Sequence, residues 1–235
     1  MKHSGTARRA GLRLILLMLA AVLAVGLLGL ALGWIGALAR FMGGAALALA
    51  GVLIMAWFLF ALFTLYFFRD PDPNTPGGPG LVVSPGHGKV DVIEQLAASQ
   101  FPGGPCHRIS MFLSVIDVHV QNAPVGARIA CVTRTPGRFI SATRADSAPQ
   151  NENVLVGLDS TETPGEKIGV RLIAGVLARR IVPFVTPGQE VSRGERISLI
   201  QFGSRCDLYL PLAYQIKVRP GDHVVGGQTV MASKP

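Results

Sequence analysis

Two long stretches without a charged side chain stand near the start of the chain, and they constrain its fold more than any other feature. The first runs from residue 14 to residue 39 and the second from residue 41 to residue 68, with Arg40 between them. Each is longer than the ~20 apolar residues that an α-helix needs to cross a bilayer. We therefore predict a transmembrane helical hairpin, which makes residues 1–69 a membrane anchor.

A cleaved signal peptide is the competing interpretation of the first stretch. Its apolar run exceeds the roughly 7–15 residues of such a signal, however, and a second apolar stretch follows at once. Basic residues predict the orientation, because they are retained on the cytoplasmic side of a membrane. Only Arg40 lies between the stretches, whereas their outer flanks carry Lys2, Arg8, Arg9, Arg13 and Arg69. We expect both ends of the hairpin, and the domain after it, on the cytoplasmic side of the cell (inner) membrane.

Charge and cysteine content narrow the class of partner and the compartment. The formal net charge is +8, from 22 basic and 14 acidic residues, and it favours anionic partners such as nucleic acid or an anionic lipid surface. No basic run interleaved with aromatic residues occurs, so no nucleic-acid partner is expected. The three cysteines show no Cys-x-x-Cys spacing, which argues against a disulfide framework and a zinc cluster and favours a reducing compartment.

The sequence changes character after the anchor. Residues 70–80, DPDPNTPGGPG, are too rich in proline and glycine for a regular element, and we interpret them as a short, stiff linker. From Leu81 on, short runs rich in Val and Ile alternate with Pro-Gly turns, and helical periodicity is largely absent. The apolar stretch from Ile168 to Val185 could hold strands or a short helix. We predict a mainly β domain over residues 81–235.

An internal repeat supports the β prediction. The pattern PGxxVxxGxx[I/V] occurs at residues 187–197 and again, with the same offset at every matched position, at residues 220–230. Each copy predicts a turn, a strand residue, a second turn and another strand. Barrel-sandwich folds of the biotinyl- and lipoyl-carrier type use such a hammerhead, so we expect a barrel-sandwich-like domain with hammerhead repeats.

Seven blocks of sequence follow one another in the order of a known family. They are FFRDP (67–71), VVSPGHGKV (82–90), SVIDVHVQNAPV (114–125), PGRFISA (136–142), IAGVLARRIV (173–182), PGQEVSRGERISLIQFGSR (187–205) and DLYLP (207–211). Through these blocks the chain resembles the short bacterial and archaeal phosphatidylserine decarboxylase proenzymes, over about residues 67–232. The resemblance implies a carboxy-lyase of phospholipid biosynthesis that converts phosphatidylserine to phosphatidylethanolamine, with a pyruvoyl cofactor and the membrane as a further partner.

The resemblance also implies that the chain cuts itself between Gly203 and Ser204. The Ser204 hydroxyl would attack the Gly203 carbonyl, where the absence of a Cβ permits a strained approach, and an N-to-O acyl shift would turn the amide into an ester. β-Elimination would then release residues 1–203, and hydrolysis would leave a pyruvoyl group at the start of residues 204–235. The two chains would remain together as a heterodimer.

Further residue roles follow from the same resemblance. The pyruvoyl ketone made from Ser204 would form a Schiff base with the substrate amine and accept electrons as CO₂ leaves. His119, in the DVHV block, matches the family's histidine, and we expect it to donate a proton and to activate Ser204. Charge alone makes Arg179, Arg180 and Arg193 candidates for phosphate contact, although solvated surface arginines fit the same pattern. No metal is expected.

The chain departs from the family pattern at several positions. His87 stands where the family carries the acidic residue that supports self-cleavage, so His87 is a further candidate catalytic residue. Asn122 replaces a basic residue, Cys206 replaces an aliphatic one, and residues 151–153 read Asn-Glu-Asn where Asn-Glu-Arg is usual. These changes bear on how efficiently the chain matures.

Other classes of protein remain open. His87 and Asp91 have the HxxxD spacing of some zinc peptidases on a similar β fold. Those enzymes also need an HxH pair, and Gln121 stands where its second histidine would be. Two protein ligands make a poor catalytic zinc site, which normally has three. The departures instead fit a degenerate homologue that binds lipid or a partner without catalysis, while a carrier protein is disfavoured because the hairpin turns hold no Met-Lys-Met-type lysine.

Overall fold

The chain folds into two compact units, one over Gly5–Arg69 and the other containing Asp70–Pro235. A computed structural model describes residues 6–32, 37–97, 104–141, 150–176, 180–201 and 204–235.

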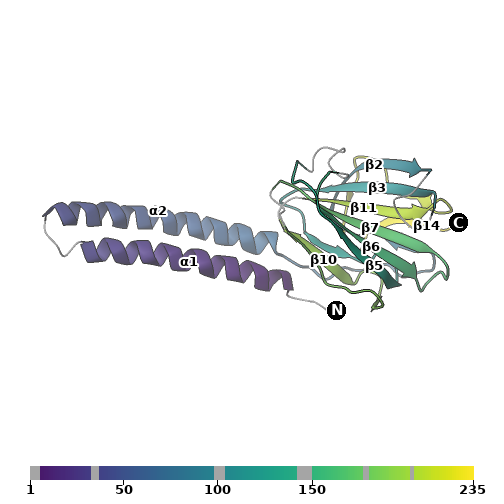
Figure 1. Cartoon of the computed structure of the whole chain (residues 1–235), viewed down its shortest axis with the longest axis horizontal. Coiled ribbons are helices and arrows are strands. Elements are labelled where there is room, and N and C mark those ends of the chain that lie inside the picture. Colours follow the sequence, from purple (N-terminus) through teal and green to yellow (C-terminus); the bar gives the residue numbers. More distant parts are fainter. Residues whose placement is uncertain (1–5, 33–36, 98–103, 142–149, 177–179, 202–203) are drawn as a thin grey trace. The chain divides into compact units, whose positions relative to one another are not determined.

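Two helices make up the first unit, α1 (Thr6–Leu32) and α2 (Ala37–Phe67), and they lie side by side in Figure 1. Small residues let the two backbones approach, since a Cβ on Gly29 would lie 3.0 Å from the Cβ of Ala46. The indole N–H of Trp57 donates to the Ile15 carbonyl at 2.9 Å, from one helix to the other. The helical hairpin predicted from the sequence is therefore present.

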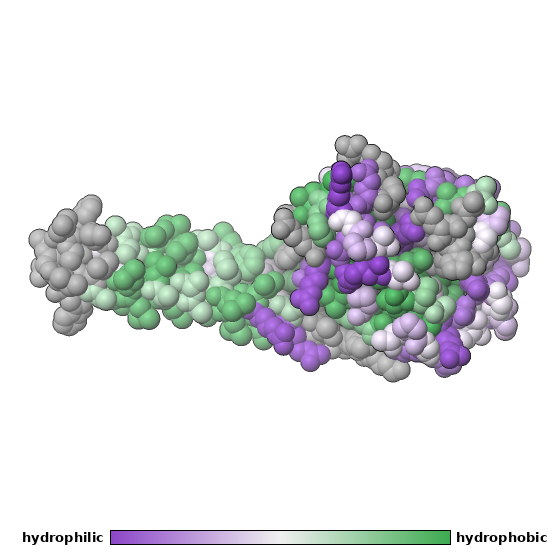
Figure 2. All heavy atoms as spheres, viewed as in Figure 1, coloured by the Kyte–Doolittle hydropathy of each residue, from purple (hydrophilic) through white to green (hydrophobic). Residues whose placement is uncertain are grey.

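Both helices expose most of their apolar side chains. The segments Arg8–Ala31 and Gly43–Phe67 are long and apolar enough to cross a membrane. Large apolar side chains are exposed along both, among them Leu17, Leu27 and Met55, and Figure 2 shows hydrophobic residues covering the visible face of the pair. Helices that are apolar all round fit a lipid environment rather than water, which favours membrane association.

The second unit is a β domain, and its described residues contain no helix. Its main sheet has eight strands in the order β13-β2-β3-β11-β7-β6-β5-β9, and every neighbouring pair is antiparallel. The strands are β2 (Gly88–Leu96), β3 (Cys106–Leu113), β5 (Ala127–Thr135), β6 (Asn153–Ser160), β7 (Lys167–Ala174), β9 (Glu190–Val191), β11 (Ser204–Pro211) and β13 (His223–Val224). The prediction of a mainly β domain is confirmed, and the stretch from Ile168 on begins with a strand.

Two three-stranded sheets, β1-β14-β12 and β4-β10-β8, complete the domain. Their strands are β1 (Leu81–Val83), β4 (Val120–Asn122), β8 (Arg180–Pro183), β10 (Arg196–Gln201), β12 (Gln215–Ile216) and β14 (Val230–Ser233). The apolar core lies on one face of the central strand β11, which contributes Cys206, Leu208 and Leu210. Because side chains alternate along a strand, Ser204 points to that same face.

The predicted hammerhead repeat is confirmed in the backbone. The glycines at matching positions of the two copies all adopt positive φ angles: 87° at Gly188, 78° at Gly194, 103° at Gly221 and 71° at Gly227. Glycine adopts this left-handed region without the steric penalty of a Cβ, which explains its presence in both turns. The first turn of each copy closes on a strand of the main sheet, Gly188 N–H on Ile129 O and Gly221 N–H on Val90 O, both at 2.8 Å.

This repeat belongs to a larger duplication of the domain. One shift along the chain relates the two closing partners, Val90 and Ile129, and the same shift carries β1 onto β4 and the start of β2 onto the start of β5. The ladders of β2 and β5 even bulge at matching places, between Val90 and Val92 and between Ile129 and Cys131. The halves also exchange equivalent bonds: Val83 N–H donates to Pro124 O, and Asn122 N–H donates to Pro85 O. The domain therefore consists of two similar halves.

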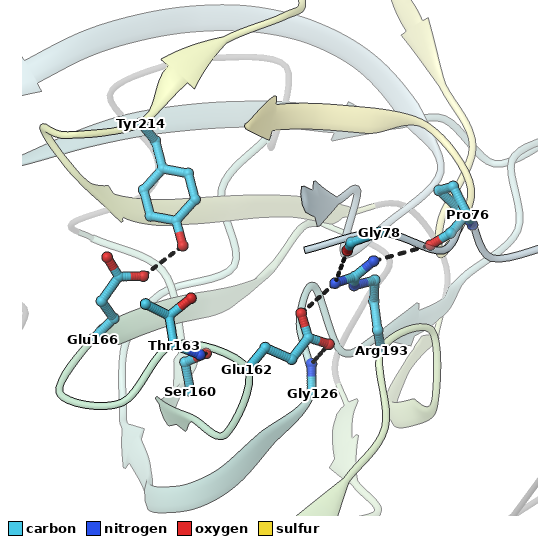
Figure 3. A network of polar contacts seen from close by, with 9 residues as sticks. All are labelled: Pro76, Gly78, Gly126, Ser160, Glu162, Thr163, Glu166, Arg193 and Tyr214. Carbon is cyan, nitrogen blue, oxygen red and sulfur yellow. Dashed lines mark hydrogen bonds and ion pairs between the residues drawn. The ribbon is translucent and has the colours of Figure 1, made fainter. Parts of the chain in front are cut away.

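Residues 70–80 form no regular element, as predicted, yet they are bound to the β domain at several points. The Arg196 guanidinium, 1% exposed, donates to the carboxylates of Asp70 at 2.7 Å and Asp72 at 2.8 Å. Farther along, Arg193 donates to the carbonyls of Pro76 at 3.0 Å and Gly78 at 2.9 Å (Figure 3). The linker is thus an integral part of the folded unit.

Candidate active site

Ser204 is the first residue of β11 and is fully buried. Its backbone lies between the ends of two neighbouring strands, opposite Leu113 of β3 and Ala174 of β7. Its hydroxyl has no hydrogen-bond partner among the described residues. A buried polar group without a partner costs about 1–3 kcal/mol, so its persistence suits a group retained for chemistry. Gly203, the other residue of the predicted cut, lies outside the described residues.

The loop that carries His87 meets β11 at this end of the sheet. The Ser84 hydroxyl donates to the Gly86 carbonyl at 2.7 Å, which closes a tight turn. Gly86 packs against the side chains of Cys206 and Leu113, the neighbours of Ser204 along and across the strands. His87 is the next residue and is half-buried. The structure therefore brings the loop bearing His87 to the end of β11 where Ser204 lies.

His119 lies in the loop between β3 and β4 and is 1% exposed. Its Nδ1 lies 2.9 Å from the Asp117 carbonyl oxygen. Because a carbonyl oxygen can only accept, Nδ1 carries the proton, and Nε2 of the neutral ring carries the lone pair. The His119 carbonyl accepts a bond from the Ile200 N–H at 3.0 Å, so its loop is joined to β10, the strand that leads into residues 202–203. His119 thus lies at the same end of the domain as Ser204.

Asn122 and Gly226 shape the surroundings of His87. A Cβ on Gly226 would lie 2.8 Å from a ring carbon of His87 and 2.9 Å from the amide oxygen of Asn122, so no larger residue fits. The Asn122 amide also donates to the Gly194 carbonyl at 2.9 Å. Asn122, one of the departures from the family pattern, therefore binds the hammerhead turn at Gly194 through its side chain.

One pair at this end of the domain escaped prediction from the sequence. The Asp117 carboxylate accepts the Ser114 backbone N–H at 2.8 Å and lies 2.9 Å from Nε2 of His223. Asp117 is 9% exposed, and His223 comes from β13. The available signal was the acidic residue two places before His119, but nothing in the sequence connects it to His223.

The other side of the central strand carries charge. Arg205 donates to both oxygens of Asp91, at 2.8 and 2.5 Å, so this carboxylate of the HxxxD spacing is bound to a guanidinium. Among the described residues no group of three His, Cys, Asp or Glu side chains could hold a metal ion.

Burial, together with the Asp207 charge, raises the pKa of the Cys206 thiol well above its usual value. The thiol therefore stays protonated and is a poor competing nucleophile beside Ser204.

The three arginines proposed for phosphate contact lie in different places. Arg179 falls outside the described residues. Arg180 is exposed at the start of β8, and its backbone pairs with that of Gln201, two residues before Gly203 in the sequence. Arg193 instead binds the linker carbonyls and the Glu162 carboxylate (Figure 3), so a phosphate would have to compete with these acceptors.

Comparisons with known proteins identify the family of this chain. Residues 60–232 match the family described as phosphatidylserine decarboxylase. A protein of Desulfotalea psychrophila named phosphatidylserine decarboxylase proenzyme is 41% identical over 77% of this chain and 83% of its own length. Proteins with the same name from Symbiobacterium thermophilum and Solibacter usitatus are 40% and 42% identical, over 82% and 75% of this chain and 92% and 81% of their own lengths. The chain therefore belongs to the phosphatidylserine decarboxylase family of enzymes.

Proposed function

We propose that the chain is a proenzyme that cuts itself between Gly203 and Ser204 and then decarboxylates phosphatidylserine to phosphatidylethanolamine. The observation that carries this proposal is the buried Ser204 hydroxyl, which lacks a partner among the described residues and lies at the end of the domain that holds the His119 loop. The relatives' name, proenzyme, supports a maturation step. The product would serve phospholipid biosynthesis.

In the first stage, His119 acts as the base. Its Nε2 lone pair accepts the Ser204 proton while the serine oxygen attacks the Gly203 carbonyl carbon. The amide C–N bond breaks and the nitrogen takes a proton, which leaves an ester. A base then takes the Cα proton of residue 204, the Cα=Cβ double bond forms, and the Cβ–O bond breaks to release residues 1–203 as a carboxylate. One water enters and one ammonia leaves as residue 204 becomes a pyruvoyl group.

In the second stage, the same residues support decarboxylation. The buried position of Ser204 fits a pyruvoyl group, because its polar side chain already lies in an enclosed place beside Gly86 and Cys206. That group would supply the electron sink for CO₂ loss. Once Nε2 of His119 is protonated, it can deliver that proton to the carbon left by CO₂, and the apolar surroundings keep water from competing. Arg180 offers its exposed guanidinium to the lipid phosphate.

His87 has a supporting role in this scheme. It stands beside Asn122 and Gly226, and a neutral imidazole there can orient Ser204 or His119 by a hydrogen bond. It cannot supply the negative charge of the family's acidic residue, so it stabilises a neighbouring imidazolium less well.

The membrane places substrate and enzyme together. We propose that α1 and α2 span the cell (inner) membrane with both ends on the cytoplasmic side, since the basic residues flank the hairpin rather than its turn. The β domain then works at the leaflet in which phosphatidylserine lies.

An intact-mass measurement on purified full-length protein tests the proposal. We expect two chains from the wild type, the shorter of which is carbonyl-reactive and covers residues 204–235. Ser204→Ala should give one uncut chain, because alanine has no nucleophile. Ser233→Ala, at the end of β14, is the matched control and should be cut normally. A wild type that remains uncut would overturn the proposal and favour a non-catalytic lipid-binding homologue.

A further inference from the structure

The Asp117 residue holds the loop of His119 by both its main chain and its side chain. Its carbonyl oxygen lies 2.9 Å from Nδ1 of His119. Its carboxylate is fixed at one oxygen by the Ser114 N–H at 2.8 Å and at the other by Nε2 of His223 at 2.9 Å. The orientation of the His119 ring therefore depends on a carbonyl whose own residue is anchored from β13.

We propose that His223 is a positioning residue for His119 and acts through the Asp117 carboxylate. The proposal rests on the function proposed above. His223 belongs to residues 204–235 and Asp117 to residues 1–203, so the contact joins the two products of the cut. It adds to the reaction a residue that never touches the substrate.

The burial of the Asp117 carboxylate makes its hydrogen bond to His223 energetically important. The Asp117 side chain is 11% exposed, whereas the His223 side chain is 60% exposed. A carboxylate held out of water needs its hydrogen bonds, because leaving one oxygen without a donor carries a desolvation cost. Without His223, the carboxylate would turn toward water and carry the Asp117 carbonyl away from the His119 ring.

The duplication of the domain supplies an independent argument. Glu190 holds the place in the first hammerhead copy that His223 holds in the second, and both occupy the same ladder position: His223 opposite Lys89 and Glu190 opposite Arg128. A glutamate could not pair with a carboxylate such as that of Asp117. The histidine thus occurs in the half of the domain that carries His119.

The test compares His223→Ala, His223→Gln and His223→Arg with the wild type, in full-length protein whose cut fraction is measured on gels. For the mature enzyme we expect His223→Ala to lower kcat about threefold to fivefold with little change in KM, the scale of a partly exposed ion pair. The kcat of His223→Gln should lie between that of the wild type and that of His223→Ala. His223→Arg should keep kcat at or above the wild-type value, because its guanidinium can also donate to the Asp117 carboxylate.

The control is His107→Ala, at the far end of β3, which should leave kcat and KM unchanged. Hydrogen exchange of the Ser114–His119 segment is a second readout that needs no activity, and His223→Ala should accelerate it in cut and uncut protein alike. Wild-type kcat and wild-type exchange in His223→Ala would overturn the inference. An uncut wild type with accelerated exchange in the variant would support the anchor and count only against the proposed function.

Discussion

His87 stands where the resemblance to the family implies an acidic residue. It follows the turn of Ser84 and Gly86, beside Asn122 and Gly226, in the loop that reaches the Ser204 end of β11. In the proposed self-cleavage, the base that takes the Ser204 proton becomes positively charged. A carboxylate nearby would stabilise that charge, whereas a protonated histidine would oppose it.

Maturation should therefore be pH-dependent in a way that a carboxylate would relieve. Histidine ordinarily titrates near pH ~6.5, so lower pH adds positive charge at the site and slows the cut. We expect His87→Asp to cut faster than the wild type, with the largest difference in mildly acidic buffer. A cleavage time course of both proteins between about pH 5.5 and 8 measures this. Equal rates throughout, or a slower aspartate variant, would show that His87 has no supporting role.

Sequence alone could predict some of these residues because their neighbours along the chain form motifs. Ser204 and His119 belong to blocks that resemble the family, and the structure puts their segments at one end of the domain. His223 could not be found in this way. It is far from Asp117 along the chain, and only the pairing of β13 with β2 brings it to the loop.

At the scale of elements, the two halves of the β domain carry different side chains at equivalent positions. The shift that carries β2 onto β5 puts Gly126 in the place of His87, and the offset between the hammerhead copies puts Arg193 in the place of Gly226. Where one half presents His87 against Gly226, the other half has Arg193 and Glu162, whose carboxylate accepts the Gly126 N–H at 2.7 Å (Figure 3). One half thus serves the candidate site, and the other binds the linker.

Removing the linker's anchor should loosen residues 70–80 without touching the chemistry. Arg193→Ala loses bonds to Pro76, Gly78 and Glu162, and we expect about 1–3 kcal/mol less stability and faster proteolysis within the linker. Arg219→Ala, which removes an exposed arginine, is the matched control. Thermal unfolding and limited proteolysis measure both variants. Equal proteolysis of the linker in the two would show that Arg193 does not hold it.

The elements also show why some features of the fold could be predicted from the sequence and others could not. The hammerhead repeat was visible because its turns need glycine at matching positions, such as Gly194 and Gly227. The larger duplication was not, since backbone pairing rather than residue type relates β2 to β5. The irregular linker followed from its prolines and glycines, but its docking depends on Arg193 and Arg196, which come much later in the chain.

For the whole molecule, the distribution of basic residues predicts which side of the membrane holds the β domain. Arg40 alone lies between the two apolar stretches, near the start of α2, whereas the other basic residues of this region lie on the outer flanks of the hairpin. Residues 1–13 and the domain after Phe68 should both face the cytoplasm. A protease added to intact cells should leave the β domain whole, and the same protease should digest it in inverted membrane vesicles. Digestion from outside would reverse the assignment.

The central place of β11 has a consequence for the lifetime of the enzyme. The strand that begins at Ser204 pairs along its length with β3 and β7, so the short chain left by the proposed cut is held in the middle of the main sheet. Once unfolded, that chain would have to find its slot as a separate molecule, and no second maturation could rebuild its first residue. Each molecule would thus be activated once and would work until its first unfolding. The height of its unfolding barrier, rather than its equilibrium stability, would then set its working life.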